Sequence, residues 1–273
     1  MKSSLHLKKS IKSIAIGSFD GIHLAHQKLI QKADGVVVIE RGNATLTPGW
    51  KRSLYTNKAT FFYMLENIKE LTPKEFIYKL KLDFPSLEKI VIGYDFTFGK
   101  NKSGTIDSLQ KYFSGQIEVI DEVKLNNISI HSRVIRELIK NNNINLANKM
   151  LNRAYRIDGY HIKGQGVGKK ELVPTINLKV VNYTLPNGVF ATNIYIEDKI
   201  YKAVTFIGRR LSVDGNFAIE THLLKTDFNQ KIKNRVWIEF ISFIRENKKF
   251  KNLTELKLQI KKDILLAKDL LNW

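Results

Sequence analysis

Residues 14–39 read IAIGSFDGIHLAHQKLIQKADGVVVI, and this stretch decides the fold of the first half of the chain. Residues 14–16 form a short apolar run typical of a buried strand, and residues 24–33 place apolar side chains on one side of a helix. Asp34-Gly35 ends that helix, and residues 36–39 form a second β-branched run. Because a strand, helix, strand unit joins parallel strands, the stretch predicts an α/β domain built on a parallel sheet.

The rest of the first half continues this alternation of short strands and helices. Two more apolar runs, residues 89–93 and 117–120, are typical of buried strands. Helical periodicity predicts five further helices, over residues 61–68, 73–82, 106–112, 132–140 and 144–151. The order of these elements favours one α/β domain that extends to about Arg153.

After Arg153 the pattern changes to short β-branched or aromatic segments separated by Gly, Asn, Asp or Pro turns. Such spacing is typical of a small antiparallel barrel. Its six strands are predicted over residues 155–162, 176–181, 189–196, 200–206, 217–224 and 235–240. A final helix begins after Asn252, which Glu255 follows as a capping partner. Its apolar stripe predicts core packing and comprises Leu256, Ile260, Ile264, Ala267 and Leu271. We therefore expect two domains, residues 1–153 and 154–273.

The composition excludes several classes of protein. The chain has 273 residues, of which 43% are hydrophobic, so it is not a disordered or low-complexity protein. It contains no cysteine, which excludes disulfides, thiolate zinc sites and thiol nucleophiles. No apolar run reaches the length of a membrane span, and the apolar stretch near the N-terminus is too short for a signal peptide. We expect a cytoplasmic protein with no membrane partner.

The formal net charge of +19 raises the possibility of nucleic-acid binding. If a basic arm were responsible, one part of the chain would carry the excess. The residues before and after the Arg153 border instead carry +10 and +9. This even distribution favours ordinary solvated surfaces, or attraction of anionic substrates, over a nucleic-acid partner.

Residues 17–27, GSFDGIHLAHQ, lie where the first predicted strand ends and the first helix begins. Ligands bind at the carboxyl ends of strands in open parallel sheets, and the start of a helix offers free N–H groups to phosphate. His23 and His26 are three residues apart, so one helical face can present both imidazoles to the same anion. Two incidental surface histidines are the alternative. A metal site is disfavoured because the pair lacks an acidic partner and the chain has no HExxH motif.

This segment resembles the HxGH nucleotidyltransferases, and it is very similar to the start of bacterial bifunctional riboflavin kinase/FMN adenylyltransferases, although Ala25 replaces the usual glycine. Residues 91–99 (VIGYDFTFG) and 132–136 (SRVIR) are similar to two later motifs of that family. The resemblance implies a Rossmann-like first domain. It implies catalytic roles for His23, His26 and Arg136, nucleotide contacts from Gly17, Phe19, Asp20 and Ser132, and flavin or nucleotide contacts from Asp95 and Phe96.

The second half carries an independent match. Residues 164–168 (GQGVG) followed by 174–177 (PTIN) resemble the glycine loop and PTxN motif of riboflavin kinases, whereas the Walker A and GxGxxG patterns both fail at the neighbouring lysines. Backbone N–H groups of Gly164, Gly166 and Gly168 can hold nucleotide phosphates, and Thr175 and Asn177 offer oxygen atoms to Mg²⁺. A turn that enters a strand is the alternative for PTIN. The resemblance places the catalytic base at Glu220, which would accept the proton of the attacking hydroxyl.

Together these motifs imply a bifunctional transferase of flavin-cofactor synthesis. ATP and riboflavin would give FMN in the second domain, and ATP and FMN would give FAD in the first. The match is poor over residues 36–76, where a strand expected before Leu71 is missing, and residues 206–213 also depart from the family pattern. Retention of only one activity is therefore an alternative, as is, more remotely, a basic nucleic-acid-binding protein.

Overall fold

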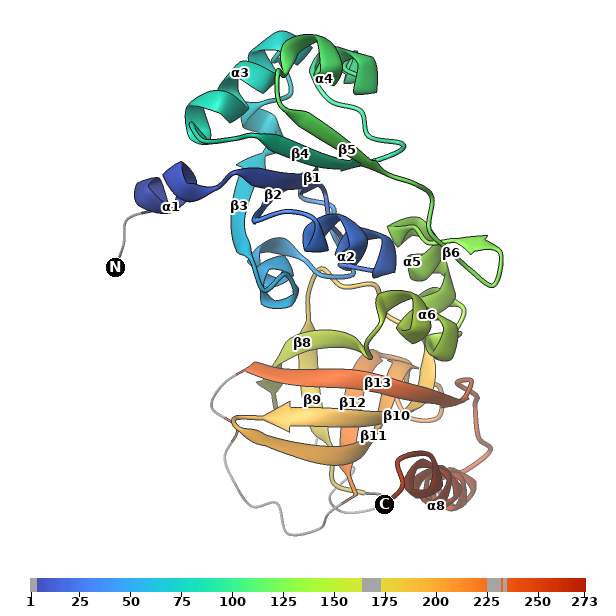
Figure 1. Cartoon of the computed structure of the whole chain (residues 1–273). Helices are drawn as coiled ribbons and strands as arrows, with labels where there is room; N and C mark the ends of the chain where they lie inside the picture. The colour runs from blue at the N-terminus through green and yellow to red at the C-terminus, as the bar shows by residue number, and fades with distance from the viewer. Residues whose placement is uncertain (1–3, 164–172, 225–231, 233–234) are drawn as a thin grey trace. The chain divides into compact units, whose positions relative to one another are not determined.

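The computed structural model describes residues 4–163, 173–224, 232 and 235–273. Internal contacts divide the chain into two compact units, Met1–Ser132 and Arg133–Trp273, whose elements are labelled in Figure 1. None of the helices in the described ranges combines the length and apolarity that a membrane crossing requires. The predicted border at Arg153 stays a prediction; it follows directly after helix α6 (Ile144–Leu151).

The first unit is built on a five-stranded sheet in which every neighbouring pair is parallel. Its strands are β1 (Ser13–Gly17), β2 (Gly35–Glu40), β3 (Ala59–Met64), β4 (Lys89–Gly93) and β5 (Gln116–Ile120). Their order is β3-β2-β1-β4-β5, so the chain leaves β1 toward one edge and later returns to pair β4 on its other side. This confirms the predicted α/β class, and it creates a switch point, where such sheets bind ligands, at the carboxyl end of β1.

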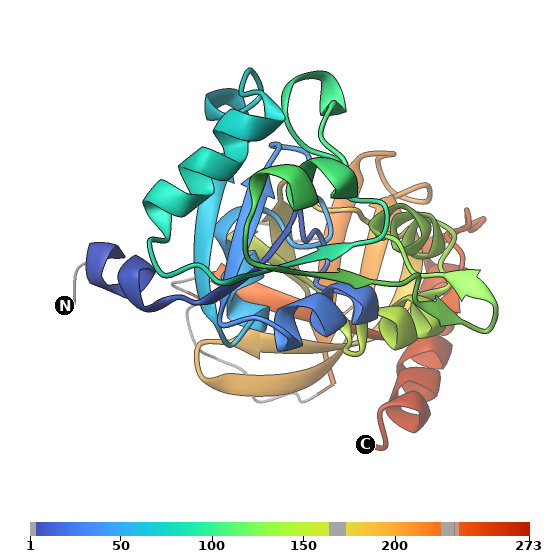
Figure 2. The same ribbon diagram turned by 45° about the horizontal axis from the view of Figure 1, so that its top comes forward.

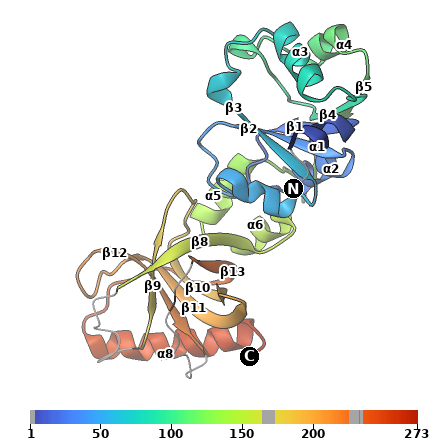
Figure 3. The same ribbon diagram turned by 90° about the vertical axis from the view of Figure 1, so that its left-hand side faces the viewer.

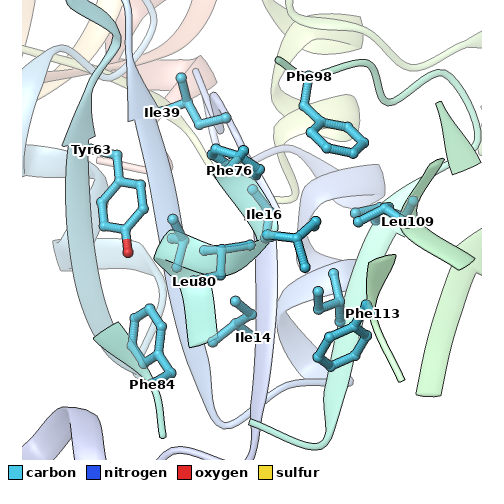
Figure 4. Close-up of a cluster of buried hydrophobic side chains, with 14 of the residues drawn as sticks. Ile14, Ile16, Ile39, Tyr63, Phe76, Leu80, Phe84, Phe98, Leu109 and Phe113 are labelled. Atoms are coloured by element: carbon cyan, nitrogen blue, oxygen red, sulfur yellow. The ribbon is translucent and has the colours of Figure 1, made fainter. Parts of the chain in front are cut away.

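Helices cover both faces of this sheet, as Figure 2 shows. Helix α2 (Leu24–Gln31) packs on Ala15 and Val91, whereas α3 (Pro73–Asp83) and α4 (Ile106–Tyr112) pack on the opposite face. In Figure 4, Ile14 and Ile16 of β1 lie among the side chains of α3 and α4. Successive side chains of a strand point to opposite faces of the sheet. Because helices cover both faces, β1 carries apolar side chains on both of them.

The helix predicted over residues 61–68 is wrong. The expectation that a strand is missing before Leu71 is also wrong. Strand β3 occupies residues 59–64, and only a short 3₁₀ turn, η2 (Leu65–Asn67), follows it. Phe61 and Tyr63 join the α3 face of the core, and Phe62 packs against the α2 face. A short apolar run does not distinguish a helix from a strand by periodicity alone. Its pairing with β2 along six residues decides the outcome.

The second unit holds most of α5 (Ser132–Lys140), α6 and a closed antiparallel barrel, which confirms the predicted six strands. In barrel order they are β10 (Gly188–Ile196), β11 (Lys199–Arg209), β12 (Phe217–Leu223), β9 (Ile176–Val180), β8 (Tyr155–Ile162) and β13 (Arg235–Arg245). Asn148 anchors α6 to the barrel, since its side-chain amide donates to the Phe240 carbonyl and accepts from the Tyr155 amide. The remaining short elements are α1 (Ser4–Ser10), η1 (Gly49–Tyr55), η3 (Lys100–Lys102), β6 (Lys124–Leu125) and β7 (Ile128–Ser129).

Helix α8 (Leu253–Leu270) lies against the outside of the barrel, as Figure 3 shows. The predicted cap is confirmed, because the Asn252 side chain accepts from the Glu255 amide. Ala267 and Leu271 of the predicted stripe are buried against barrel residues. The Arg245 guanidinium also forms a bidentate pair with the buried Asp263 carboxylate, at 2.7–3.0 Å, which ties the helix to the end of β13.

Candidate functional site

The turn between β1 and α2 has an unusual backbone. Phe19 and Ile22 adopt left-handed φ values of 51° and 43°, which is rare for non-glycine residues and strained for a β-branched one. Both side chains are fully buried, so packing holds the backbone in this form. His23 follows as the N-cap of α2, and its Nδ1 accepts from the His26 amide at 3.4 Å.

The turn brings the two predicted histidines together. Their rings stack with centroids 3.6 Å apart and planes at 19°, and the edge of Phe19 contacts His26 at 5.1 Å between centroids. His23 is 3% exposed. Ring nitrogens of both residues therefore meet at the carboxyl end of β1, where they can donate hydrogen bonds to the same anionic ligand.

Both histidines line a cavity of about 350 Å³, called here the histidine cavity, which opens at the carboxyl ends of the strands. Besides the two histidines, which were predicted as catalytic, its lining includes all but Asp20 of the nucleotide and flavin contacts predicted for this unit, namely Gly17, Phe19, Asp95, Phe96 and Ser132. The distances in sequence between these segments are large, so their convergence is a result of the sheet order. Their roles toward a ligand stay predictions.

Eight further polar residues of this cavity were not predicted: Ser18, Arg41, Tyr94, Thr97, Lys102, Asp121, Glu122 and His131. Arg41 directly follows β2 and Tyr94 directly follows β4, so a search of the residues after each predicted strand would have found them. The Tyr94 hydroxyl lies 3.3 Å from Nε2 of His131.

Asp20 has a structural contact that sequence reasoning missed. Its buried carboxylate accepts hydrogen bonds from the backbone amides of Thr45, Leu46 and Thr47, at 2.9–3.2 Å. Its own carbonyl accepts from the Ser132 hydroxyl at 2.8 Å. Asp20 thus connects the histidine turn to two distant segments, and its predicted nucleotide contact stays a prediction.

Four predicted site residues cannot be placed at the histidine turn: Arg136 of the first predicted domain and three glycines of the second. Arg136 is half-buried on α5 and belongs to the second unit, so its catalytic role stays a prediction. Gly164, Gly166 and Gly168 lie outside the described residues.

Glu220 lies on the outer side of the barrel, because its neighbours Ile219 and Thr221 are buried inside. Its Oε1 accepts from Nη1 of Arg210 at 3.2 Å, and Nη2 of Arg210 donates to Asp214 at 2.7 Å. Burial raises the pKa of Glu220 above its ordinary value, and the Arg210 charge opposes that rise. The net rise makes Glu220 a stronger base than a glutamate with the ordinary pKa.

Glu220 and Thr175 line a second cavity of about 130 Å³, called here the Glu220 cavity, between the barrel and α8. Its walls are largely apolar, from Val189, Val204, Phe206, Ile260 and Ile264. His222 fixes the segment before Thr175, since its Nδ1 lies 2.9 Å from the Pro174 carbonyl. The lining also contains His222, Asp263 and three cationic residues, so Glu220 is not its only polar group. The apolar walls suit a flat aromatic substrate that carries a hydroxyl group.

Asn177 is the register partner of Glu220 in the pairing of β9 and β12, so their side chains leave the same face of the sheet. It lines a neighbouring cavity of about 260 Å³ that also contacts Lys163, Lys179 and Arg210. Among the described residues no group of three His, Asp or Glu side chains could hold a metal. A cation here would therefore take neutral oxygens from Thr175 and Asn177, a donor type that Mg²⁺ accepts when phosphates and water complete its shell.

Two family models match the chain, a FAD synthetase model over residues 53–134 and a riboflavin kinase model over residues 151–271. A relative from Buchnera aphidicola subsp. Acyrthosiphon pisum, a bifunctional riboflavin kinase/FMN adenylyltransferase, is 32% identical, and the match covers 98% of this chain and 97% of the relative. The chain belongs to the bifunctional riboflavin kinase/FMN adenylyltransferase family. A relative of the same name from Haemophilus influenzae is 30% identical over 95% of this chain and 94% of its own.

A solved structure shares the fold of this family member over its whole length. It is described as a macrolide-efflux protein from Streptococcus pneumoniae, and it superposes with a TM-score of 0.83 at 25% identity, covering 97% of each chain. The FAD synthetase model begins only at residue 53, so the segment after β2 lies outside the matched range. That segment contains Arg41 and the partners of Asp20.

Proposed function

We propose that this enzyme phosphorylates riboflavin to FMN in its barrel and adenylylates FMN to FAD at the histidine cavity, with ATP as co-substrate in both reactions. Membership of the bifunctional family over nearly the full chain carries this conclusion. The two cavities support it, because the histidine cavity is lined by His23 and His26, and the Glu220 cavity by Glu220 and Thr175. We place the reactions in the cytoplasm, with small-molecule substrates and no nucleic-acid partner.

In the kinase reaction, the terminal ribityl hydroxyl of riboflavin attacks the γ-phosphorus of ATP. The new O–P bond replaces the bond to the β-phosphate oxygen, and ADP leaves. Glu220 accepts the hydroxyl proton, an action worth roughly 10²- to 10⁴-fold in rate. Arg210 orients the carboxylate through its hydrogen bond to Oε1. Thr175 and Asn177 would hold Mg²⁺, which when bound neutralises charge on the phosphates.

In the adenylyl transfer, a phosphate oxygen of FMN attacks the α-phosphorus of ATP, and pyrophosphate leaves. The attacking oxygen is already an anion, so no general base is needed. The reaction depends on alignment and on stabilising the charge that spreads over the α-phosphate. His23 and His26 are placed to donate hydrogen bonds to that group, and we assign Arg136 the same kind of role.

A second candidate keeps the fold but only the kinase activity. Two observations favour considering it: Ala25, in place of the usual glycine between the histidines, lines the histidine cavity, and the family model does not cover residues 40–52. A methyl group at position 25 narrows the space available to a nucleotide.

The test is a flavin assay with two substrates supplied separately. Riboflavin, ATP and Mg²⁺ should give FMN and then FAD on chromatographic separation, and supplied FMN should give FAD. Glu220→Gln should stop FMN formation and spare FMN conversion, whereas His26→Ala should do the reverse. FMN formation without any FAD would establish the kinase-only candidate, and no product from a folded preparation would refute both.

A further inference from the structure

The turn after β2 carries a cation of the histidine cavity on a rigid support. Glu40 is the last residue of β2, and its Oε1 accepts from the Gly42 amide at 2.7 Å. Gly42 has a φ of 74°, which a glycine adopts without strain. This closed turn projects Arg41, between them, to the lining of the cavity.

The other oxygen of Glu40 pairs with Arg52, whose side chain is 1% exposed. The other two nitrogens of Arg52 also donate: Nη1 to the Ser18 carbonyl at 2.6 Å, and Nε to the Gly49 carbonyl at 3.1 Å. Ser18 directly precedes the strained residue Phe19. One buried guanidinium therefore connects the turn that carries Arg41 to the turn that carries the histidines.

The Arg41 guanidinium itself is exposed and makes no ion pair or hydrogen bond with any residue in the described part of the chain. It is charged at every physiological pH. The cavity carboxylates all lie on the other side of β1: Asp95 follows β4, and Asp121 and Glu122 follow β5. Lys102 also belongs to that side. An anionic group is therefore favoured on the β2 side, between Arg41 and the histidines.

We propose that Arg41 binds a phosphate group of a substrate in the histidine cavity, and that the buried pair of Glu40 and Arg52 is the positioning device that holds it. The inference rests on the proposed adenylyl transfer, which supplies two sources of that phosphate, ATP and FMN. The planar fork of arginine suits a phosphate better than the ammonium of lysine, because it can donate two parallel hydrogen bonds.

The test of Arg41 compares Arg41→Ala with Arg41→Lys and with Lys58→Ala, which removes one exposed charge from the start of the neighbouring strand β3. Loss of a charge-assisted hydrogen bond should raise the KM for either ATP or FMN by roughly 10- to 100-fold, and the substrate affected identifies the source. Arg41→Lys should recover part of this loss, and Lys58→Ala should leave both KM values unchanged. Wild-type KM values for both substrates in Arg41→Ala would overturn the assignment.

A binding measurement separates this inference from the proposed function. Calorimetric titration with inorganic pyrophosphate needs no turnover, and Arg41→Ala should weaken its binding by a similar factor. If the wild-type protein makes no FAD, the proposed adenylyl transfer fails, and the titration still decides the role of Arg41. Equal pyrophosphate affinity in wild type and Arg41→Ala would refute an anion-binding role.

The positioning device is tested with Glu40→Gln, which removes the charge opposite Arg52 and keeps the side-chain shape. Because the pair supports both turns, KM should rise and kcat for FAD formation should fall together, whereas Arg41→Ala should act mainly on KM. Riboflavin phosphorylation by the same preparation reports that the chain is folded. A folded Glu40→Gln protein with wild-type KM, kcat and pyrophosphate affinity would overturn the positioning role.

Discussion

Replacement of Glu220 by glutamine tests the kinase site most directly. The amide has nearly the same size as the carboxylate, and its oxygen can still accept the hydrogen bond from Arg210, so the local structure should be kept. What is lost is the ability to accept a proton from the ribityl hydroxyl. We expect kcat for FMN formation to fall by roughly 10²- to 10⁴-fold, which corresponds to about 3–5 kcal/mol in the activation free energy.

The stability of the same variant separates loss of the base from loss of the fold. Burial raises the pKa of Glu220 in the folded protein, so its stability contribution is greatest below the unfolded pKa and is lost as pH rises through the folded pKa. At neutral pH, burial of the Glu220 carboxylate lowers the free energy of unfolding, and a neutral glutamine removes this destabilisation. Glu220→Gln should therefore unfold at the same or a higher temperature than wild type, as measured by calorimetry.

The assay follows FMN formation under saturating riboflavin and Mg-ATP, with Asp214→Asn as the matched control. Asp214 also accepts a hydrogen bond from Arg210, but it does not line the Glu220 cavity. The control should retain kcat within about tenfold, or about 1.4 kcal/mol in the activation free energy, because Asp214 lies outside the cavity lining. If Glu220→Gln keeps more than a tenth of the wild-type kcat while it is folded, Glu220 is not the catalytic base.

Three further outcomes are expected. The kcat for FMN formation in wild type should fall as the pH drops through the raised pKa of Glu220, and measurement of the same profile in Glu220→Gln should show no such limb. Asp263→Asn should lower the free energy of unfolding by about 3 kcal/mol because it leaves Arg245 without its charge partner, whereas the exposed Asp269→Asn should change it by less than about 0.5 kcal/mol in denaturant titrations. Asp20→Ala should lower kcat/KM for FAD formation at least about tenfold and spare FMN formation, since three backbone amides lose an acceptor; equal losses in the two assays would contradict this.

Elements with both a clear period and a terminal signal were predicted from the sequence within a residue or two. Strand β4 ends at Gly93, α6 begins after the capping residue Asn143, and the cap of α8 forms as expected. The segment that forms β3 lacked such signals. Phe61 and Tyr63 pack in one core and Phe62 in the other, and this alternation forms only when the segment pairs with β2. A local sequence pattern could therefore not identify the strand.

The residues of the candidate site likewise fall into those that the sequence could identify and those that it could not. The chemical roles proposed for His23, His26 and Glu220 rest on short motifs, so sequence alone identified these residues as candidates. Arg52 carries no motif, because its partners Ser18, Glu40 and Gly49 are defined only by the folded chain. Each nitrogen of the buried Arg52 side chain contacts a different one of these residues, and such contacts produce no periodic pattern in the sequence.

This difference changes how the departure from the family pattern after β2 should be interpreted. The strained backbone at Phe19 and Ile22 costs of order 1–3 kcal/mol per residue, and it persists only where surrounding contacts determine it. Part of that support is the core packing of both side chains, and part comes from residues 40–52, through Glu40, Arg52 and the amides bound by Asp20. A segment that holds the histidine turn in a strained form is under a structural requirement even where its sequence is unlike that of its relatives. The departure therefore does not argue for loss of adenylyl transfer, and the FMN assay should show that activity retained.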